Sequence, residues 1–168
     1  FPAGHIIQIV QTVKNDVFVA AGNTNEQLIT GFNRSITPQK TGSKILLHYT
    51  FDTSTRAATT ARSYMERDIG NAGYSKLTGI MGNDPGSTAG DPSLSHAGIP
   101  PDANWYMNRV AGMYLDSPSY SIGNAITYRI GIQSEASARE IYVGTTHRDN
   151  TQYHPRTASV LILMEVAA

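Results

Sequence analysis

The last part of this sequence, from Met113 to Ala168, carries apolar side chains on alternate positions, and this pattern limits the chain to a β fold. A two-residue period places one face of a pleated strand against a core and the other face outward. The apolar positions of three successive segments are Ile126, Tyr128, Ile130 and Ile132, then Ile141 and Val143, and finally Val160, Ile162, Met164 and Val166. The sequence predicts that these side chains face the core. A chain that ends in a buried strand, with no catalytic motif attached, is typical of a structural module.

The same alternation predicts strands in the rest of the chain. The clearest runs from Lys44 to Asp52, where the side chains expected to share the core face are Ile45, Leu47, Tyr49 and Phe51. Further strands are expected at residues 5–13, 16–20, 27–36, 61–69, 74–80 and 105–115. The first of them is expected to place Ile7, Ile9 and Val13 on one side and Gln8 and Thr12 on the other. Many short strands separated by turn signals indicate an antiparallel β-sandwich or barrel. No stretch longer than a turn is typical of a helix.

Residues 82–101 differ from the rest of the chain. Most of the residues that break regular structure gather in Asn83-Asp-Pro-Gly86, Gly90-Asp-Pro92 and Pro100-Pro101. The sequence therefore predicts one long loop, and such loops inside compact domains are usually functional or disordered. Because the composition does not shift across it, residues 1–168 are expected to form a single domain.

The composition excludes several classes of partner. The 168 residues carry no net charge, and the 13 Lys and Arg residues are scattered, whereas phosphate neutralisation needs clustered cations, so nucleic-acid binding is not expected. No apolar run reaches the length of a membrane span, so membrane insertion is not expected either. The absence of cysteine removes disulfides and thiolate metal sites. The chain begins with Phe1 and not with methionine, which indicates a processed product or a portion of a longer product.

Metal chemistry has weak support in the sequence. His147 and His154 flank Asp149, but zinc sites usually show closely spaced pairs on a rigid element. Asp84 and Asp91 lie in the long loop without the alternating ligands and closing Glu of an EF-hand. Solvated histidines and turn-forming aspartates explain these residues better, so no metal and no cofactor is expected.

Hydrolytic chemistry is weakly supported as well. The chain has no Gly-x-Ser-x-Gly elbow and no phosphate-binding loop. Paired carboxylates for glycan cleavage would have to come from Glu66, Asp68, Glu135 or Glu140. Glu66 and Asp68 share a strand face, and this leaves a glycan hydrolase as a minor alternative. The prediction is that the chain is not an enzyme.

Aromatic side chains gather around the long loop and the strands after it, at Trp105, Tyr106, Tyr114, Tyr120 and Tyr153. Exposed aromatics stack on sugar rings and anchor interfaces, whereas buried ones fill a core, and core filling is favoured here. If the loops bind a ligand, the candidate residues are Asp84, Asp91, His96, Trp105, Tyr106, His147, Arg148, Asp149, Tyr153 and His154.

Several strand and turn motifs also carry a resemblance to a known family. They are Met113-Tyr-Leu-Asp-Ser-Pro118, Ile126-Thr-Tyr-Arg-Ile130, Ile141-Tyr-Val143 and Ala158-Ser-Val-Leu-Ile-Leu-Met-Glu-Val166, preceded by Gly4 to Lys14, Gly31 to Pro38 and Ser43 to Leu47. In this order they resemble a C-terminal β-sandwich domain of bacteriophage virion and fibre proteins, common in viruses of aquatic bacteria. The resemblance implies a β-sandwich on the outside of a phage particle and no catalytic residue.

The resulting hypothesis is an exterior virion structural protein, folded as an antiparallel jelly-roll-like β-sandwich. Sandwiches leave unpaired strand edges that particles bury against symmetry mates, and the resemblance to fibre domains implies a homotrimer. Other virion proteins and host-surface glycans are the further expected partners. A tail-fibre tip that attaches to the host and a capsid decoration both remain open, and the alternative from another class is a soluble carbohydrate-binding module.

Overall fold

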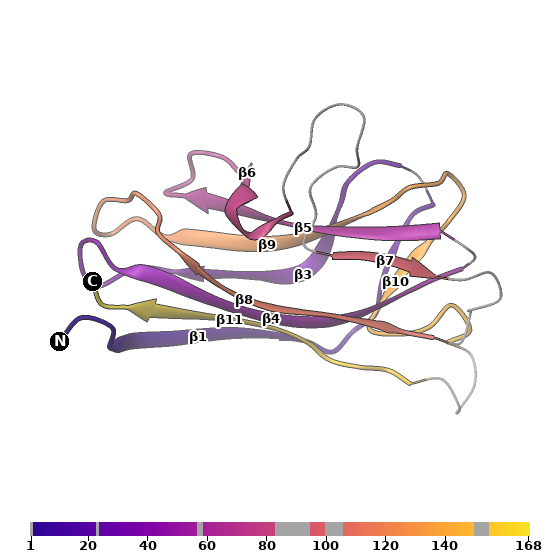
Figure 1. Cartoon of the computed structure of the whole chain (residues 1–168), viewed down its shortest axis with the longest axis horizontal. Coiled ribbons are helices and arrows are strands. Elements are labelled where there is room, and N and C mark those ends of the chain that lie inside the picture. Colours follow the sequence, from indigo (N-terminus) through magenta and orange to yellow (C-terminus); the bar gives the residue numbers. More distant parts are fainter. Residues whose placement is uncertain (1, 23, 57–58, 83–94, 100–105, 150–154) are drawn as a thin grey trace.

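The structure is a computed structural model that describes residues 2–22, 24–56, 59–82, 95–99, 106–149 and 155–168, with the backbone alone at 95–99. Its described residues form an all-β sandwich of two antiparallel sheets, seen edge-on in Figure 1. The regular helical structure described is one 3₁₀ turn, η1 (Thr78–Ile80). Within the described residues, no helix has the length and hydrophobicity that crossing a membrane requires. The predicted fold class is confirmed.

The first sheet forms the lower layer in Figure 1. Its strands are β1 (Ile6–Lys14), β11 (Ser159–Val166), β4 (Lys44–Thr55), β8 (Asn108–Asp116), β10 (Ile141–Val143) and β2 (Phe18–Ala20). β4 is central because it pairs with β8 along one edge and with β11 and then β10 along the other. β1 pairs with β11, and β2 with β10. The first sheet is thus four strands wide, in the order β1-β11-β4-β8.

The second sheet forms the upper layer. Its strands are β3 (Gln27–Ile36), β9 (Ile126–Ser134), β5 (Thr59–Ile69), β6 (Ser75–Lys76) and β7 (Ser95–Ile99). β9 lies between β3 and β5, and both short strands pair with the remaining edge of β5. Because the order β1-β11-β4-β8 in one layer faces the order β3-β9-β5-β7 in the other and the chain passes repeatedly between the layers, the topology is that of a jelly roll.

The core fills the space between the sheets, as the predicted pattern of β4, β9 and β10 requires. The predicted core residues of these three strands are all buried: Ile45, Leu47, Tyr49, Phe51, Ile126, Tyr128, Ile130, Ile132, Ile141 and Val143. Phe32 of β3 meets Phe51 of β4 edge to face, with ring centroids 5.7 Å apart. Because these two rings come from opposite sheets, their contact joins the layers.

The orientation predicted for β11 is wrong, and the side of β1 that carries Ile9 and Val13 faces outward. Ile9 and Val13 of β1 are 59% and 46% exposed. In β11 the side chains that point inward are Ser159, Leu161, Leu163 and Glu165, which leaves Val160, Ile162, Met164 and Val166 on the outer face. The inner face of β1 contacts β3 through a hydrogen bond. The Thr12 hydroxyl donates to the Asn33 carbonyl at 2.7 Å. On β1, Thr12 and Lys14 thus point inward together with Val10, which packs against the core, while Ile9 and Val13 point outward.

The long loop predicted at residues 82–101 is also only partly correct. Its last part forms β7, which pairs antiparallel with β5 from Thr59↔Ile99 to Ser63↔Ser95. The unpaired edge of β5 offers N–H and C=O groups to any neighbouring segment, and the weak strand composition of Ser-His-Ala-Gly-Ile conceals this pairing in the sequence. Residues 83–94 lie outside the described residues.

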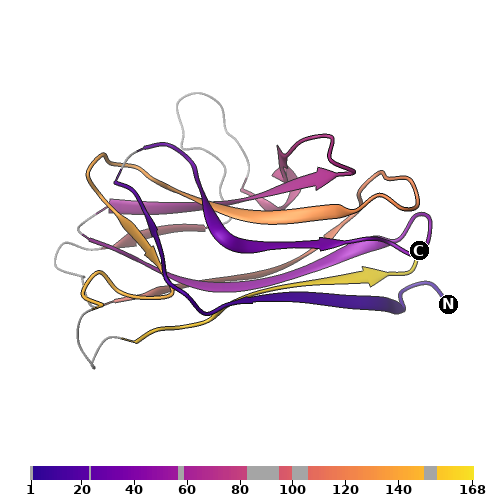
Figure 2. The same cartoon turned by 180° about the vertical axis from the view of Figure 1, so that it is seen from behind.

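The two chain ends meet at one end of the sandwich (Figures 1 and 2). The Gly4 N–H donates to the Ala167 carbonyl at 2.9 Å, and the Ala167 N–H donates to the His5 carbonyl at 2.8 Å. The opposite end carries the connection after β10 and the start of β8, where most of the candidate binding residues were predicted.

Candidate functional site

The far end of β4 brings two candidate segments together. Asn108 at the start of β8 and Val143 at the end of β10 both pair with Thr53, from opposite edges of β4. Tyr106 and residues 147–149 therefore lie at the same end of the sandwich, although far apart in sequence. His96 belongs to β7, in register with Arg62. The other candidates, Asp84, Asp91, Trp105, Tyr153 and His154, lie outside the described residues.

His147 is held against an aromatic ring. Its imidazole stacks on Tyr142 of β10, with centroids 5.4 Å apart and an interplanar angle of 11°. The Tyr142 hydroxyl donates to Glu140 at 2.6 Å, and burial together with this carboxylate raises the pKa of Tyr142 to about 12. Burial, followed by the nearby Arg56 charge, lowers the pKa of His147. The stacked ring and the lowered pKa favour a neutral imidazole with a packing role, where the sequence indicated a solvated or hydrogen-bonded loop histidine.

Asp149 forms an ion pair with Arg156 within the connection that follows β10. Its two carboxylate oxygens accept hydrogen bonds from the Nε and Nη2 atoms of Arg156, at 2.9 and 2.8 Å. A bidentate pair of this kind fixes both side chains in one plane. Asp149 therefore anchors the segment leading to β11.

The described part of the chain contains no group of three His, Asp or Glu side chains placed to hold a metal ion. The carboxylates considered for glycan cleavage have partners of another kind. Glu66 accepts from Arg129 at 2.6 Å, and Asp68 accepts from the Gly73 N–H at 3.0 Å. Glu135 pairs with Arg62 at 2.5 Å. These pairings stabilise the second sheet and the turn after β5.

The aromatic candidates divide between core and surface. Tyr114 and Tyr120 pack against the hydrophobic core, and the Tyr120 hydroxyl donates to the Lys40 carbonyl at 2.6 Å. Tyr106 is 67% exposed, so it is the described aromatic candidate with the most surface to offer a ligand. Core filling accounts for the first two residues, and binding remains a prediction for Tyr106.

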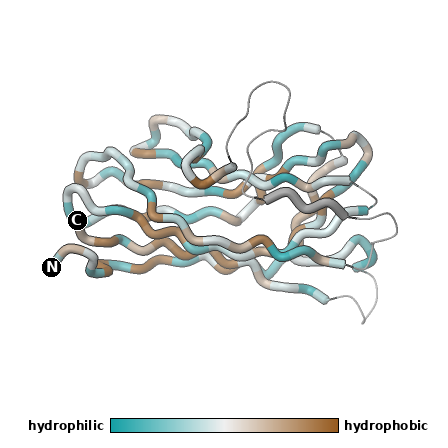
Figure 3. Tube along the Cα trace, viewed as in Figure 1, coloured by the Kyte–Doolittle hydropathy of each residue, from teal (hydrophilic) through white to brown (hydrophobic). Residues whose placement is uncertain are grey.

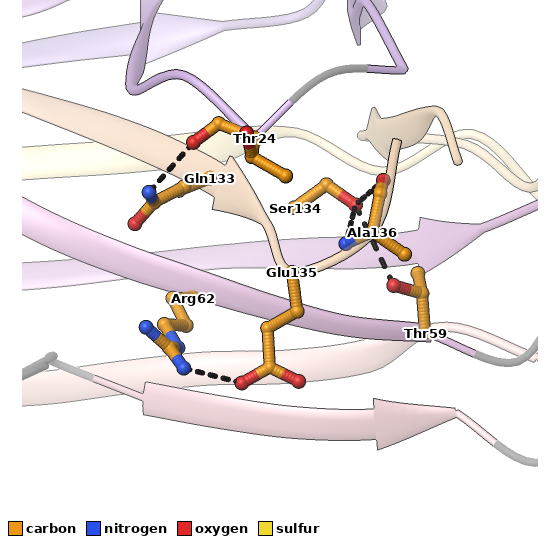
Figure 4. A network of polar contacts seen from close by, with 7 residues as sticks. All are labelled: Thr24, Thr59, Arg62, Gln133, Ser134, Glu135 and Ala136. Carbon is orange, nitrogen blue, oxygen red and sulfur yellow. Dashed lines mark hydrogen bonds and ion pairs between the residues drawn. The ribbon is translucent and has the colours of Figure 1, made fainter. Parts of the chain in front are cut away.

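A polar network fastens the loop end of the second sheet, as Figure 4 shows. The Gln133 amide of β9 donates to the Thr24 carbonyl at 2.8 Å, while Ser134 bonds to both the carbonyl and the N–H of Ala136. Arg62 of β5 reaches Glu135 beside it. The network ties the connection before β3 to the end of β9, so it positions the surface around it without leaving a free reactive group.

The outer face of the second sheet is polar and ion-paired. Arg62–Glu135 and Glu66–Arg129 pair side chains across it, and Lys76 pairs with Glu26. The Arg129 guanidinium lies 3.3 Å from the centroid of the Tyr74 ring. Charged side chains along the outer face of a strand are typical of a surface in contact with water.

The outer face of the first sheet is apolar instead. We call it the apolar face and define it by Ile9 and Val13 of β1, Leu46 of β4, Met113 and Leu115 of β8, and Val160, Ile162 and Met164 of β11. One cross-strand row, Ile9–Met164–Leu46–Leu115, contains no polar side chain. Figure 3 shows hydrophobic stretches along these strands of the lower layer. Sheets whose outer face is in water alternate apolar and polar residues, and this sheet departs from that rule.

Polar groups border the apolar face at both ends. Lys44 lies at one end of β4, next to Val166. At the other end Arg109 donates to both Asp52 oxygens, each at 2.9 Å. An apolar centre with a polar rim is the usual anatomy of a protein interface.

Alternation within single strands did not predict this face, because it is formed by four strands that are distant in sequence. A signal was present, since β1 and β11 carry apolar residues at adjacent as well as alternate positions. Strands that read as continuously apolar are usually covered on both faces.

Comparisons with known proteins show likeness at the level of structure alone. No family model and no curated protein matches the chain. Among solved structures, it is similar to a chain in the structure of the infectious bursal disease virus Gx strain, with 14% identity and a TM-score of 0.46. The match covers 99% of this chain but 37% of the virus chain, so this chain spans about a third of the length of that protein. At this identity and TM-score the likeness carries no inference about function.

Proposed function

We propose that this chain is a structural component on the exterior of a virus particle, where it assembles with copies of itself and with other particle proteins. One observation carries the proposal: a jelly roll whose first sheet turns an apolar face outward while the second sheet turns an ion-paired face outward. Jelly rolls serve as capsid and lectin domains. Because a fold alone does not define a task, the apolar face is the stronger support, since it suits a module built to be covered.

The finer features of the proposal rest on the resemblance of the sequence to phage fibre and virion domains. It supports a homotrimer, with the termini at one end of each sandwich and the β10–β11 connection at the other. In such an arrangement the end that holds Tyr106 and residues 147–149 faces outward, where many copies multiply weak contacts with host-surface glycans into avidity. The chemistry proposed is noncovalent, and we propose no enzymatic step.

The direct test is mass spectrometry on density-gradient-purified particles from cultures that produce this protein, with the soluble fraction measured in parallel. We expect peptides of the chain to copurify with the particles at a constant ratio to the major shell protein. Recovery in the soluble fraction alone would contradict the proposal and favour a free carbohydrate-binding module.

A second measurement separates the two placements on the particle. Purified protein that adsorbs to host cells, and loses adsorption when Tyr106 is changed to Ala, would support a fibre or spike tip. Failure to adsorb would favour a capsid decoration.

A further inference from the structure

We propose that copies of this chain associate through the apolar face, each copy burying its own apolar face against that of its neighbours. This inference rests on the proposed self-assembling role and names the surface that performs it. The partner is a further copy of the chain, and the contact is between sheets and not between loops.

The composition of the apolar face permits contact with itself. Between Lys44 at one end and the Arg109–Asp52 pair at the other, the outward side chains that neighbour the members of the apolar face are uncharged polar or small residues together with His48. A face of this kind meets its own copy without opposing like charges, which would disfavour association. The second sheet could not do the same, because its ion pairs would have to lose water on contact.

The size of the face is also adequate. Its four most exposed side chains, Ile9, Val13, Met113 and Leu115, each leave between 44% and 65% of their surface exposed. With the half-buried side chains of β11 and β4 this amounts to on the order of 600 Å² of apolar surface, compared with ~800 Å² per partner in a standard interface. The largest apolar patch of a typical monomer reaches ~300–600 Å² and is often functional. Side chains near β1 and β8 would supply the rest of the area that one partner buries in a standard interface.

The shape of the sheet fits three copies. Four strands spaced ~4.8 Å apart make a face roughly 15–19 Å wide. Three such faces around a three-fold axis would lie about 5 Å from the axis, which is half of the ~10 Å that separates packed sheets. Side chains of ordinary length therefore fill the space between them. β1 and β8 form the two sides of this face, and each pairs with one strand within the described residues, so association would also cover their free edges.

Two charge substitutions and a matched control test the inference. Ile9→Glu and Met113→Glu place a carboxylate in the apolar face, at positions exposed enough that the isolated fold tolerates it. Leu28→Glu makes the same change on the outer side of the second sheet, where Leu28 is 38% exposed. Mass in solution is measured by light scattering during size-exclusion chromatography. Circular dichroism and urea unfolding verify that each variant is folded.

We expect an oligomer for the parent chain and for Leu28→Glu, and a fall to monomer mass for both face variants. A parent chain that stays monomeric at every concentration, or face variants that keep the parent mass, would overturn the inference. If the parent chain is a dimer and both face variants are monomers, the result supports association through the apolar face and contradicts only the trimer. Copurification with particles is measured independently of the mass in solution. A result that contradicts the interface therefore does not by itself contradict the role in the particle, and the reverse also holds.

Discussion

Both carboxylate oxygens of Glu165 accept the backbone N–H of Gln39, each at 3.0 Å, although Glu165 is fully buried at the end of β11. The Lys40 N–H and the Gln8 side-chain amide donate to the same carboxylate, at 3.1 and 2.7 Å. A charge at an inward position thus holds the β3–β4 connection in place. It also occupies a core position that an aliphatic residue would normally fill.

Replacing Glu165 with Gln is expected to lower the free energy of unfolding by about 1–3 kcal/mol, because the new amide retains one acceptor and turns an NH₂ group toward backbone donors. The measurement is urea unfolding at neutral pH. Glu26→Gln is the control, since it alters a partly exposed ion pair with Lys76 and should cost less than about 1 kcal/mol. Equal losses in the two variants would contradict the assigned role of Glu165.

Acid is expected to weaken the fold through the same carboxylate and through Asp52. Burial opposes ionisation of Glu165, but the hydrogen bonds from Gln39 and Gln8 outweigh it and lower the pKa. The hydrogen bond from Arg109 lowers the pKa of Asp52 against the effect of burial. Such groups stabilise the fold at pH values above their unfolded pKa of about 4, and this contribution is lost as the pH falls through the folded pKa.

Urea unfolding from pH 7 to pH 3 should therefore show stability falling below about pH 4. The fall should be smaller in Glu165→Gln than in the parent chain. A parallel pH dependence of the two proteins would exclude Glu165 as a cause.

His147 gives a local pH prediction. Burial, together with the Arg56 charge, lowers its pKa, so its NMR titration midpoint should lie below the ~6.5 of a free histidine. Tyr142→Ala removes the stacked ring, admits water and should move the midpoint upward. A midpoint that does not change in the variant would mean that the ring does not shield His147.

Much of the fold could be predicted from the sequence because period-two alternation directly reports one-sided burial. β9 and β4 show this, since Ile130 and Leu47 are fully buried where the pattern placed them. The pattern failed where both faces of a strand are apolar, as at Ile9 and Met164, because alternation then gives no sign of which face is inward.

The candidate site was less accessible to prediction. Local sequence identified residues 147–149 as a polar segment but could not reveal that His147 stacks on Tyr142, because that contact depends on the path of the chain after β10. The apolar face joins four strands that are distant in sequence. Its cross-strand rows follow from strand register, which no single segment specifies.

Gly131 and Tyr64 form a close-packed cross-strand pair in the second sheet. They are in register between β9 and β5, and a Cβ atom at Gly131 would lie 2.2 Å from the Tyr64 ring. Gly131→Ala is therefore expected to lower the free energy of unfolding by about 1–3 kcal/mol, because the ring must move off its rotamer. Urea unfolding measures the loss.

A double-mutant cycle tests the cause. In a Tyr64→Ala background the ring is absent, so Gly131→Ala should cost much less than in the parent chain. If Gly131→Ala lowered the free energy of unfolding equally in both backgrounds, the backbone at Gly131 and not the Tyr64 ring would be the cause of the loss. Gly82→Ala is the control, since no atom of the described residues lies within 4 Å of a Cβ atom built there.

Asp116 links the two sheets through an ion pair with Arg67 and a hydrogen bond from Tyr128, and we expect these two contacts to contribute unequally to the free energy of unfolding. It extends from β8 in the first sheet and accepts from Arg67 Nη1 at 2.6 and 2.8 Å and from the Tyr128 hydroxyl at 2.6 Å. Arg67→Met should destabilise the fold by about 3 kcal/mol, because it leaves a buried carboxylate without its counter-charge. Tyr128→Phe should cost about 1 kcal/mol, since the ion pair remains to hold the charge.

The order of these two losses is the critical result, measured by urea unfolding at neutral pH. Arg34→Met is the control for removing an arginine, because Arg34 is exposed on β3 and should change stability by less than about 0.5 kcal/mol. If Tyr128→Phe were the costlier change, the hydroxyl rather than the guanidinium would be the main support of Asp116. The Arg67→Met, Asp116→Leu double variant should recover part of the stability lost in Arg67→Met, because it leaves no unpaired buried charge between the sheets.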